Sequence, residues 1–228
     1  MPRRAGANRN FGIQHARGKY VCCLDADDKI DPTYIEKAVF LLEHYEYDVV
    51  STKLQFFGDR MDMCGVIERP VLADMLQGNH ILTCAVFRRA LWEKADGIHD
   101  FHEPDGHVHE DWAFWVRLAA LGARFFNING EPLFYYRSHG VSLSNKSVLP
   151  DDRQIDVIKS YNADVLDQNA IANSLNLALE DRRAQFPLQN IARYATSSRP
   201  SILIAFPFTI IGGAERLLSG ITEYLTRQ

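Results

Sequence analysis

Hydrophobic positions follow two different spacings along the first 140 residues or so of the chain. Apolar residues three and four positions apart predict helices over 7–16, from residue 32 onwards, from residue 91 to near Gly97, and over 110–121. Short apolar runs predict strands over 20–24, 48–52, 81–87, 124–128 and 132–137. Because strands alternate with helices, the sequence predicts an α/β sandwich with a largely parallel sheet.

Two of these helices carry clear boundary signals. Asp31 is expected to cap the second helix with Pro32 at its first position, and Ile35, Ala38, Val39 and Leu42 form its apolar stripe. The helix over 110–121 places four apolar side chains on one face, those of Trp112, Trp115, Val116 and Ala119. Gly122 is expected to end it.

The pattern changes after Ser144. Residues 146–199 are polar and helix-prone and end in a Ser-Ser-Arg-Pro stretch, which indicates a helical extension followed by a linker. Residues 200–228 then read as one strand, a Gly-Gly turn and one amphipathic helix, too little to bury a core. We therefore expect a main domain over 1–145, an extension over 146–199, and the beginning of a second, truncated domain over 200–228.

Composition narrows the function classes. The chain has 228 residues, 46% hydrophobic and 24% charged, with a net charge of −4, which is ordinary for a folded domain and gives no general attraction to nucleic acid. Its apolar runs are far shorter than the ~20 residues that cross a bilayer, so at most peripheral membrane association is expected. The four cysteines match neither a zinc site nor a disulfide framework. Buried free thiols favour a reducing compartment, and we expect a cytoplasmic protein.

The first chemical signal is the acidic run Asp25-Ala26-Asp27-Asp28, directly after an apolar strand. Carboxylates at alternate positions there can reach one hard cation, and oxygen ligands suit Mg²⁺ or Mn²⁺. Strand ends are also where open α/β sheets bind small molecules. The alternative is a set of solvated turn residues. From the residues alone the two interpretations are evenly balanced.

Two weaker signals follow. Glu110 and Asp111 open the strongest helix, where the helix dipole favours carboxylates but where a general base could also be held rigidly. His139 follows the last strand and is more typical of a hydrogen-bonded surface residue than of a ligand. His99, His102, His107 and His109 could together form a zinc site, although their spacing matches no common pattern and a loop over an active site is the favoured interpretation.

Taken together, these segments resemble the inverting family 2 glycosyltransferases of the GT-A fold. Residues 8–13 (NRNFGI), 16–20 (ARGKY) and 24–28 (LDADD) are similar to that family's first signature. Residues 85–89 (AVFRR) with 95–98 (ADGI) are similar to its second, with Asp96 in place of the usual glycine. Its third signature is matched by residues 109–112 (HEDW). Its fourth signature is matched within 136–144, by Tyr136-Arg137, His139, Ser142 and Ser144.

The resemblance implies a role for each of these residues. Asp25 and Asp27 would bind the divalent cation, Mg²⁺ or Mn²⁺, and the nucleotide-diphosphate sugar, with His139 completing the metal site. Arg9, Asn10 and Arg137 would contact the same donor. Asp111, with Glu110 beside it, would deprotonate the acceptor hydroxyl, so that the sugar is transferred with inversion. The acceptor would be a glycan or a lipid-linked acceptor, as in cell-surface polysaccharide synthesis, and the inner face of the membrane is one place where the enzyme could act.

The chain departs from the family in one respect. The "VSVVIPTYN" and "DDGS" segments that precede these motifs in the family do not occur here, so the base pocket is missing and we expect a GT-A domain truncated at its N-terminus. Residues 202–205 and 212–216 resemble the opening of a family 4, GT-B glycosyltransferase. The rival hypotheses are a non-catalytic GT-A-like module that binds a nucleotide or a partner, a metal-dependent hydrolase using the histidines, and a nucleotidyltransferase.

Overall fold

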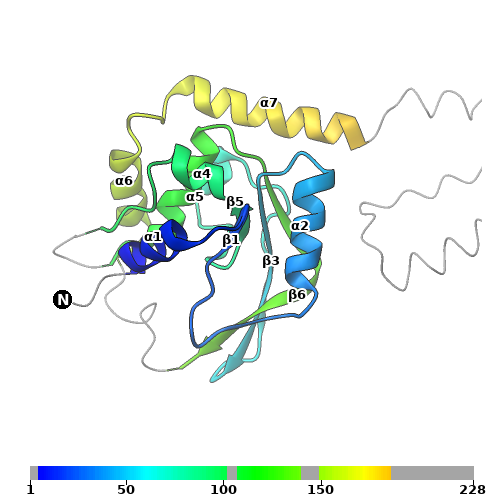
Figure 1. Ribbon diagram of the computed structural model, residues 1–228. Helices are drawn as coiled ribbons and strands as arrows, with labels where there is room; N and C mark the ends of the chain where they lie inside the picture. The colour runs from blue at the N-terminus through cyan, green and yellow to red at the C-terminus, as the bar shows by residue number, and fades with distance from the viewer. Residues whose placement is uncertain (1–4, 102–106, 140–148, 186–228) are drawn as a thin grey trace, which may run out of the picture. The chain divides into compact units, whose positions relative to one another are not determined.

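The computed structural model describes residues 5–101, 107–139 and 149–185 (Figure 1). The helices are α1 (Ala5–His15), α2 (Tyr34–His44), α3 (Leu72–Met75), α4 (Arg89–Lys94), α5 (Glu110–Ala120), α6 (Asp151–Tyr161) and α7 (Gln168–Gln185). The strands are β1 (Tyr20–Cys22), β2 (Lys29–Ile30), β3 (Val49–Gly58), β4 (Met63–Cys64), β5 (Val86–Arg88) and β6 (Phe125–Ser138). Met1–Arg182 form one compact unit, and every contact discussed below lies within it.

The described strands form a six-stranded sheet in the order β1-β5-β3-β6-β2, with β4 beside β3. The α/β class is as predicted, but the expected parallel character is limited to the central β3–β6 pair, because the other described pairings are antiparallel. The reason lies in the connections. A parallel neighbour needs a crossover that returns the chain to the same end of the sheet, whereas the segment from β3 to β5 brings β5 back antiparallel to the first residues of β3.

Strands β3 and β6 form a long parallel ribbon that continues beyond β1 and β5 (Figure 1). The sequence predicted two strands over 124–128 and 132–137, but β6 is one strand whose register shifts opposite Lys53, where Pro132 pairs. Of the run 81–87, predicted as one strand, only Val86 and Phe87 belong to the sheet, in β5 (Val86–Arg88). Its earlier residues instead bond to neighbouring side chains, as in the hydrogen bond from Leu82 N to Ser51 Oγ (3.1 Å).

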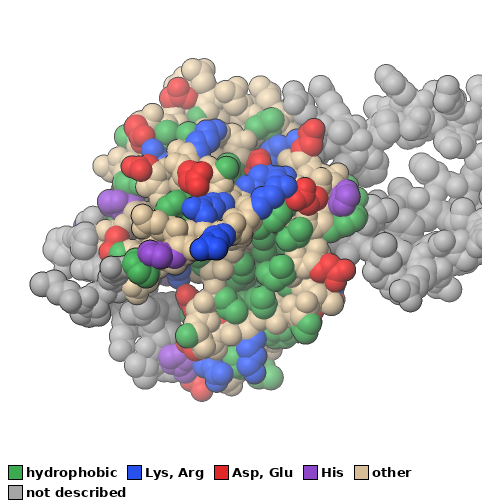
Figure 2. Space-filling model, in the orientation of Figure 1, with side chains coloured by type: hydrophobic (Ala, Val, Ile, Leu, Met, Phe, Trp, Pro, Cys, Tyr) green, Lys and Arg blue, Asp and Glu red, His purple; other side chains and the backbone are tan. Residues whose placement is uncertain are grey.

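Helix α2 covers one face of the sheet, while α4 and α5 lie on the other (Figure 1). The buried side of α2 is formed by Tyr34, Ala38, Leu41 and Leu42, so the predicted stripe is rotated and Ile35 is exposed. The helix starts at Tyr34 rather than Pro32, so Asp31 is not its N-cap. Asp31 stabilises the turn before the helix by accepting hydrogen bonds from Thr33 N and Oγ1. Figure 2 shows hydrophobic side chains gathered on the outer face where α2 lies, with charges of both signs around them.

Helix α6 belongs to the same core as α5. Ile158 and Leu149 are buried in the cluster that contains Trp112 and Trp115, and Asn162 Nδ2 donates to Ala113 O. The helical character expected after residue 146 is present in α6 and α7, but the expected domain end at residue 145 is not, because the compact unit continues to Arg182. The strand and helix predicted within 200–228 lie outside the described residues.

All four cysteines are free thiols, as expected. Burial raises the pKa of Cys22 to about 12 and that of Cys23 to about 11, so both thiols stay protonated. Among the described helices, none is long and apolar enough to cross a membrane.

Candidate active site

A cavity of about 680 Å³ opens where several chain segments meet, and its volume is typical of small-molecule sites. Its wall is formed by the turn after β1, the start of α5, the segment before β5 and one face of the β3–β6 ribbon. Four predicted site residues line it: Arg9, Asp25, Glu110 and Asp111. Segments more than 80 residues apart in sequence, 25–28 and 110–111, therefore contribute to one cavity.

The acidic run forms a tight turn at the edge of this cavity. Asp28 N donates to Asp25 O (3.1 Å), and the side chains of Asp25 and Asp28 line the cavity. Burial, together with the charges of Asp27 and Asp25, raises the pKa of Asp28 to about 6, although a hydrogen bond from Arg137 N acts in the opposite direction. Negative charge is thus crowded at this turn.

Arg137 and His139 both contact Asp27 beside the cavity, next to its lining residues Asp28 and Ser138. His139 Nε2 lies 3.1 Å from Asp27 Oδ2, and Arg137 Nε donates to Asp27 O (3.0 Å). The hydrogen bond with His139 lowers the pKa of Asp27 below its ordinary value. Two predicted metal ligands, far apart in sequence, are therefore side by side.

The donor set fits a divalent cation that is completed by a substrate. Asp25 and Asp27 are exposed carboxylates with side-chain exposures of 48% and 50%, two positions apart on one turn. Among the described residues, no group of three His, Cys, Asp or Glu side chains is arranged to hold a metal ion by itself. Mg²⁺ commonly takes one or two carboxylates and fills its remaining positions with water and substrate phosphates. The acidic turn matches that kind of site better than a closed protein cage.

The two carboxylates at the start of α5 have different environments. Glu110 is 6% exposed and forms an ion pair with Arg9, while burial and the charge of Asp111 raise its pKa. Asp111 is half-buried and lines the cavity; its Oδ1 accepts from Trp112 N (2.8 Å) and its Oδ2 from Thr83 Oγ1 (2.6 Å). Of the two, Asp111 is the one not neutralised by an ion pair with Arg9, and thus the better placed to accept a proton.

Arg9 connects three elements. From α1 its guanidinium pairs with Glu110 at the start of α5 and with Asp25 (3.1 Å) in the turn after β1. Burial alone would lower the pKa of Arg9, but the charges of Glu110 and Asp25 raise it above its ordinary value. Its described contacts are therefore with the site's own carboxylates, and it holds the two acidic segments at a fixed separation.

Asn10, predicted to contact the donor, is used elsewhere. Its Oδ1 accepts hydrogen bonds from Trp92 Nε1 and Ile98 N (both 2.8 Å), and its Nδ2 donates to Ile98 O (2.7 Å). This amide joins α1 to the turn after α4, where Gly97 has a φ of 86° and lies against it. The structure thus places Asn10 in a packing position rather than on the cavity wall.

The cavity lining also includes residues that were not predicted from the sequence. One face of the β3–β6 ribbon presents Leu54 and Phe56 opposite Phe134 and Tyr136, and the rings of Phe56 and Tyr136 meet edge to face at 5.7 Å. Alternate apolar positions in the two strands are the signal that could have indicated this face. Thr83 carries no such signal, because its contact with Asp111 spans 28 residues.

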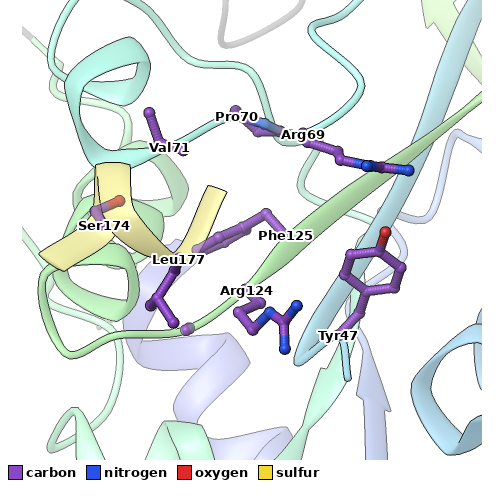
Figure 3. Close-up of a pocket in the computed structure, with 9 residues that line it drawn as sticks. Tyr47, Arg69, Pro70, Val71, Arg124, Phe125, Ser174 and Leu177 are labelled. Atoms are coloured by element: carbon purple, nitrogen blue, oxygen red, sulfur yellow. The ribbon is translucent and has the colours of Figure 1, made fainter. Parts of the chain in front are cut away.

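The remaining candidates lend no support to a second site. Of the loop histidines, His99 stacks on Tyr161 (4.2 Å) and His107 meets His109 edge to face (5.5 Å), while His102 lies outside the described residues. A second pocket of about 30 Å³ lies where α7 approaches the start of β6, with Ser174, Leu177 and Phe125 around it (Figure 3). That volume is close to the space occupied by one water molecule.

Part of the chain is similar to known glycosyltransferases. Residues 2–93 match the model of the family described as Glycosyl transferase family 2; this range includes the acidic run and ends before Asp111 and His139. The "Uncharacterized glycosyltransferase YibD" of Escherichia coli (strain K12) is 28% identical over 165 residues, covering 61% of this chain and 44% of that protein.

Solved structures show the same fold. The crystal structure of S. aureus TarS 1–349 in complex with UDP-GlcNAc has a TM-score of 0.51 and 19% identity, covering 67% of this chain and 46% of that chain. TarS 1–349 alone has a TM-score of 0.51 and 20% identity, covering 78% and 52% respectively. The chain therefore has the GT-A-like α/β fold, and it spans about half of the length of these relatives.

Proposed function

We propose that this chain, whose residues 2–93 match glycosyl transferase family 2, transfers a sugar from a nucleotide-diphosphate sugar to an acceptor hydroxyl with inversion. The observation that carries the proposal is the shared cavity, in which an acidic turn and a rigidly held carboxylate, Asp111, face one space. The acidic turn can hold the cation that a donor diphosphate requires, and Asp111 can accept the proton of an attacking hydroxyl.

Each side chain then has a defined task. Asp25 and Asp27, with His139 against Asp27, would hold Mg²⁺ or Mn²⁺, which supplies neutralisation of the charge on the leaving diphosphate. Asp111 accepts the proton of the acceptor hydroxyl, and Glu110 is kept in its ion pair with Arg9. Arg137, which donates to Asp27 O, would contact the same phosphates. The acceptor is a glycan or lipid-linked sugar in our proposal, as in polysaccharide synthesis on the cytoplasmic side.

Binding measurements with variants test this proposal. UDP-GlcNAc, the ligand of the TarS complex, is the first donor to titrate calorimetrically, with and without Mn²⁺. We expect binding that requires Mn²⁺, is lost in Asp27→Ala and is retained in Asp111→Asn. We expect Asp111→Asn to transfer sugar about 10²–10⁴-fold more slowly than the unaltered chain, because the general base is removed.

A matched control separates site effects from general ones. Asp164 is also an exposed aspartate paired with a basic side chain, Arg117 (2.9 Å), but it lies outside the cavity. Asp164→Asn should therefore bind and transfer normally. Full turnover by Asp111→Asn would refute its role as base. Metal-dependent binding without any transfer by the unaltered chain would instead favour a non-catalytic nucleotide-binding module.

A further inference from the structure

The hydroxyl of Thr83 contacts the carboxylate that the proposed reaction depends on. Thr83 Oγ1 donates to Asp111 Oδ2 at 2.6 Å, and both side chains line the cavity. The bond is part-buried and joins the segment before β5 to the first turn of α5. A neutral donor at this position can orient a carboxylate without cancelling its charge.

The segment that carries Thr83 is anchored on both sides. Leu82 N donates to Ser51 Oγ of β3 (3.1 Å). On the other side, Cys84 O accepts from Cys22 Sγ of β1 and from Tyr34 Oη of α2, both at 3.1 Å. Cys84 is 1% exposed. Thr83 is therefore presented from fixed backbone, which is what a positioning group requires.

Asp111 is held equally firmly from its own helix. Trp112 N donates to Asp111 Oδ1 (2.8 Å), and Trp112 is 2% exposed with its Nε1 donating to Met75 O (2.7 Å). Each carboxylate oxygen thus accepts one hydrogen bond. Because an ionised carboxylate has about four acceptor positions, capacity remains for a proton from the cavity.

Arg9 is the competing partner. It already pairs with the adjacent Glu110 and with Asp25, and the charge of Asp111 also raises the pKa of Arg9, so Asp111 lies within its electrostatic reach. A carboxylate drawn into that ion pair would be a poorer base, since an opposite charge favours its deprotonated form. The hydrogen bond from Thr83 opposes this movement.

We propose that Thr83 is a positioning residue that keeps the Asp111 carboxylate facing the cavity, so that Asp111 rather than Glu110 takes the acceptor proton. The inference rests on the proposed function. Thr83 does not need to touch the donor or the acceptor, and its contribution is transmitted through one oxygen, Asp111 Oδ2.

Three variants of the full chain test this. Thr83→Val removes the hydroxyl and nearly preserves shape, and Thr83→Ser restores the hydroxyl. Thr33→Val is the matched control, since it removes another 2.6 Å hydroxyl–carboxylate bond, from Thr33 Oγ1 to Asp31 Oδ1. We expect Thr83→Val to lower kcat by up to about 100-fold, as misplaced catalytic groups do. KM for the donor should not change, Thr83→Ser should recover most of kcat, and Thr33→Val should match the unaltered chain.

Crystal structures of the same variants distinguish failure of this inference from failure of the proposed function. The Asp111 carboxylate should leave its position in Thr83→Val and keep it in Thr83→Ser. An unchanged kcat in Thr83→Val, or a loss that Thr83→Ser shares, would overturn the inference. If the unaltered chain transfers no sugar, the proposed function fails. The crystal structures of the variants then test by themselves whether Thr83 positions the Asp111 carboxylate. A carboxylate displaced only in Thr83→Val then supports positioning, and one that stays in place refutes it.

Discussion

At the scale of single residues, the three aspartates of the acidic run have three different environments. Asp25 pairs with Arg9, Asp27 contacts His139, and Asp28 is half-buried and accepts a hydrogen bond from Arg137 N. Asp25 and Asp27 could be identified as candidates from the sequence but Asp28 could not, because side-chain burial after a strand depends on distant residues. Here that residue is Arg137, whose backbone lies over the turn.

Asp28 makes a testable contribution to the pH dependence of stability. Its pKa is about 6 in the folded chain against an ordinary value of 3.8, so the folded state binds more protons than the unfolded state between these values. This group therefore lowers the free energy of unfolding as the pH rises from about 4 through about 6. Relative to the unaltered chain, Asp28→Asn should gain stability over that range, as measured by urea denaturation.

An aspartate with the opposite shift provides the control. Hydrogen bonds from Thr33 lower the pKa of Asp31. Asp31 therefore stabilises the folded chain above its ordinary pKa, and this stabilisation is lost as the pH falls. As the pH rises through the acidic range, the free energy of unfolding of Asp31→Asn should therefore fall relative to that of the unaltered chain. A stability difference for Asp28→Asn that is independent of pH would contradict the environment assigned to Asp28.

At the scale of elements, prediction succeeded where the signal was local. The helix expected over 110–121 is α5 (Glu110–Ala120), because its apolar stripe and the terminal Gly122 lie within one segment. It failed where pairing decides the outcome. Residues 129–131 are polar and include a glycine, which is typical of a turn, and they have no partners in β3, but β6 continues through this irregularity and pairs again with β3 from Pro132 onwards.

Asn10 provides a prediction about how elements are joined. Asn10→Ala would leave the half-buried Trp92 Nε1 and the backbone of Ile98 without these partners, so the free energy of unfolding should fall by about 1–3 kcal/mol. Gln14→Ala, at an exposed position of the same helix, should have little effect. If the role is packing, the folded Asn10→Ala variant binds UDP-GlcNAc with nearly unchanged affinity. A selective loss of binding without loss of stability would restore the donor-contact hypothesis.

At the scale of the whole molecule, sequence motifs located two acidic segments of the cavity but not most of its lining. The acidic run and the Glu110–Asp111 pair were recognisable because they occur in the order of the family motifs that they resemble. The aromatic face of the β3–β6 ribbon was not, because apolar alternation is equally typical of an ordinary core strand. The end of the compact unit was also misplaced, since the polar character of 146–182 concealed the few residues that α6 buries, such as Ile158.

The continuity of this unit can be measured. Ile158 is 0% exposed within the cluster around α5, so Ile158→Ala should lower the free energy of unfolding by about 2–5 kcal/mol. Lys159→Ala, next to it on the exposed side of α6, should cost far less. Urea denaturation followed by tryptophan fluorescence should show one transition in each case. A separate early transition for α6 would indicate an independent extension, as the sequence first suggested.

The two short strands beside the β3–β6 ribbon have a consequence for solubility. Strand β4 pairs with β3 at Leu54 and Gln55, and β2 pairs with β6 at Phe134 and Tyr135, so both margins of the ribbon are occupied near its aromatic positions. Unpaired strand margins recruit strands from other molecules and start aggregation, and very short flanking strands are one way in which natural sheets prevent it. Within the described residues, the ribbon can therefore expose aromatic side chains to the cavity while its backbone beside Leu54 and Phe134 is already paired within the same chain.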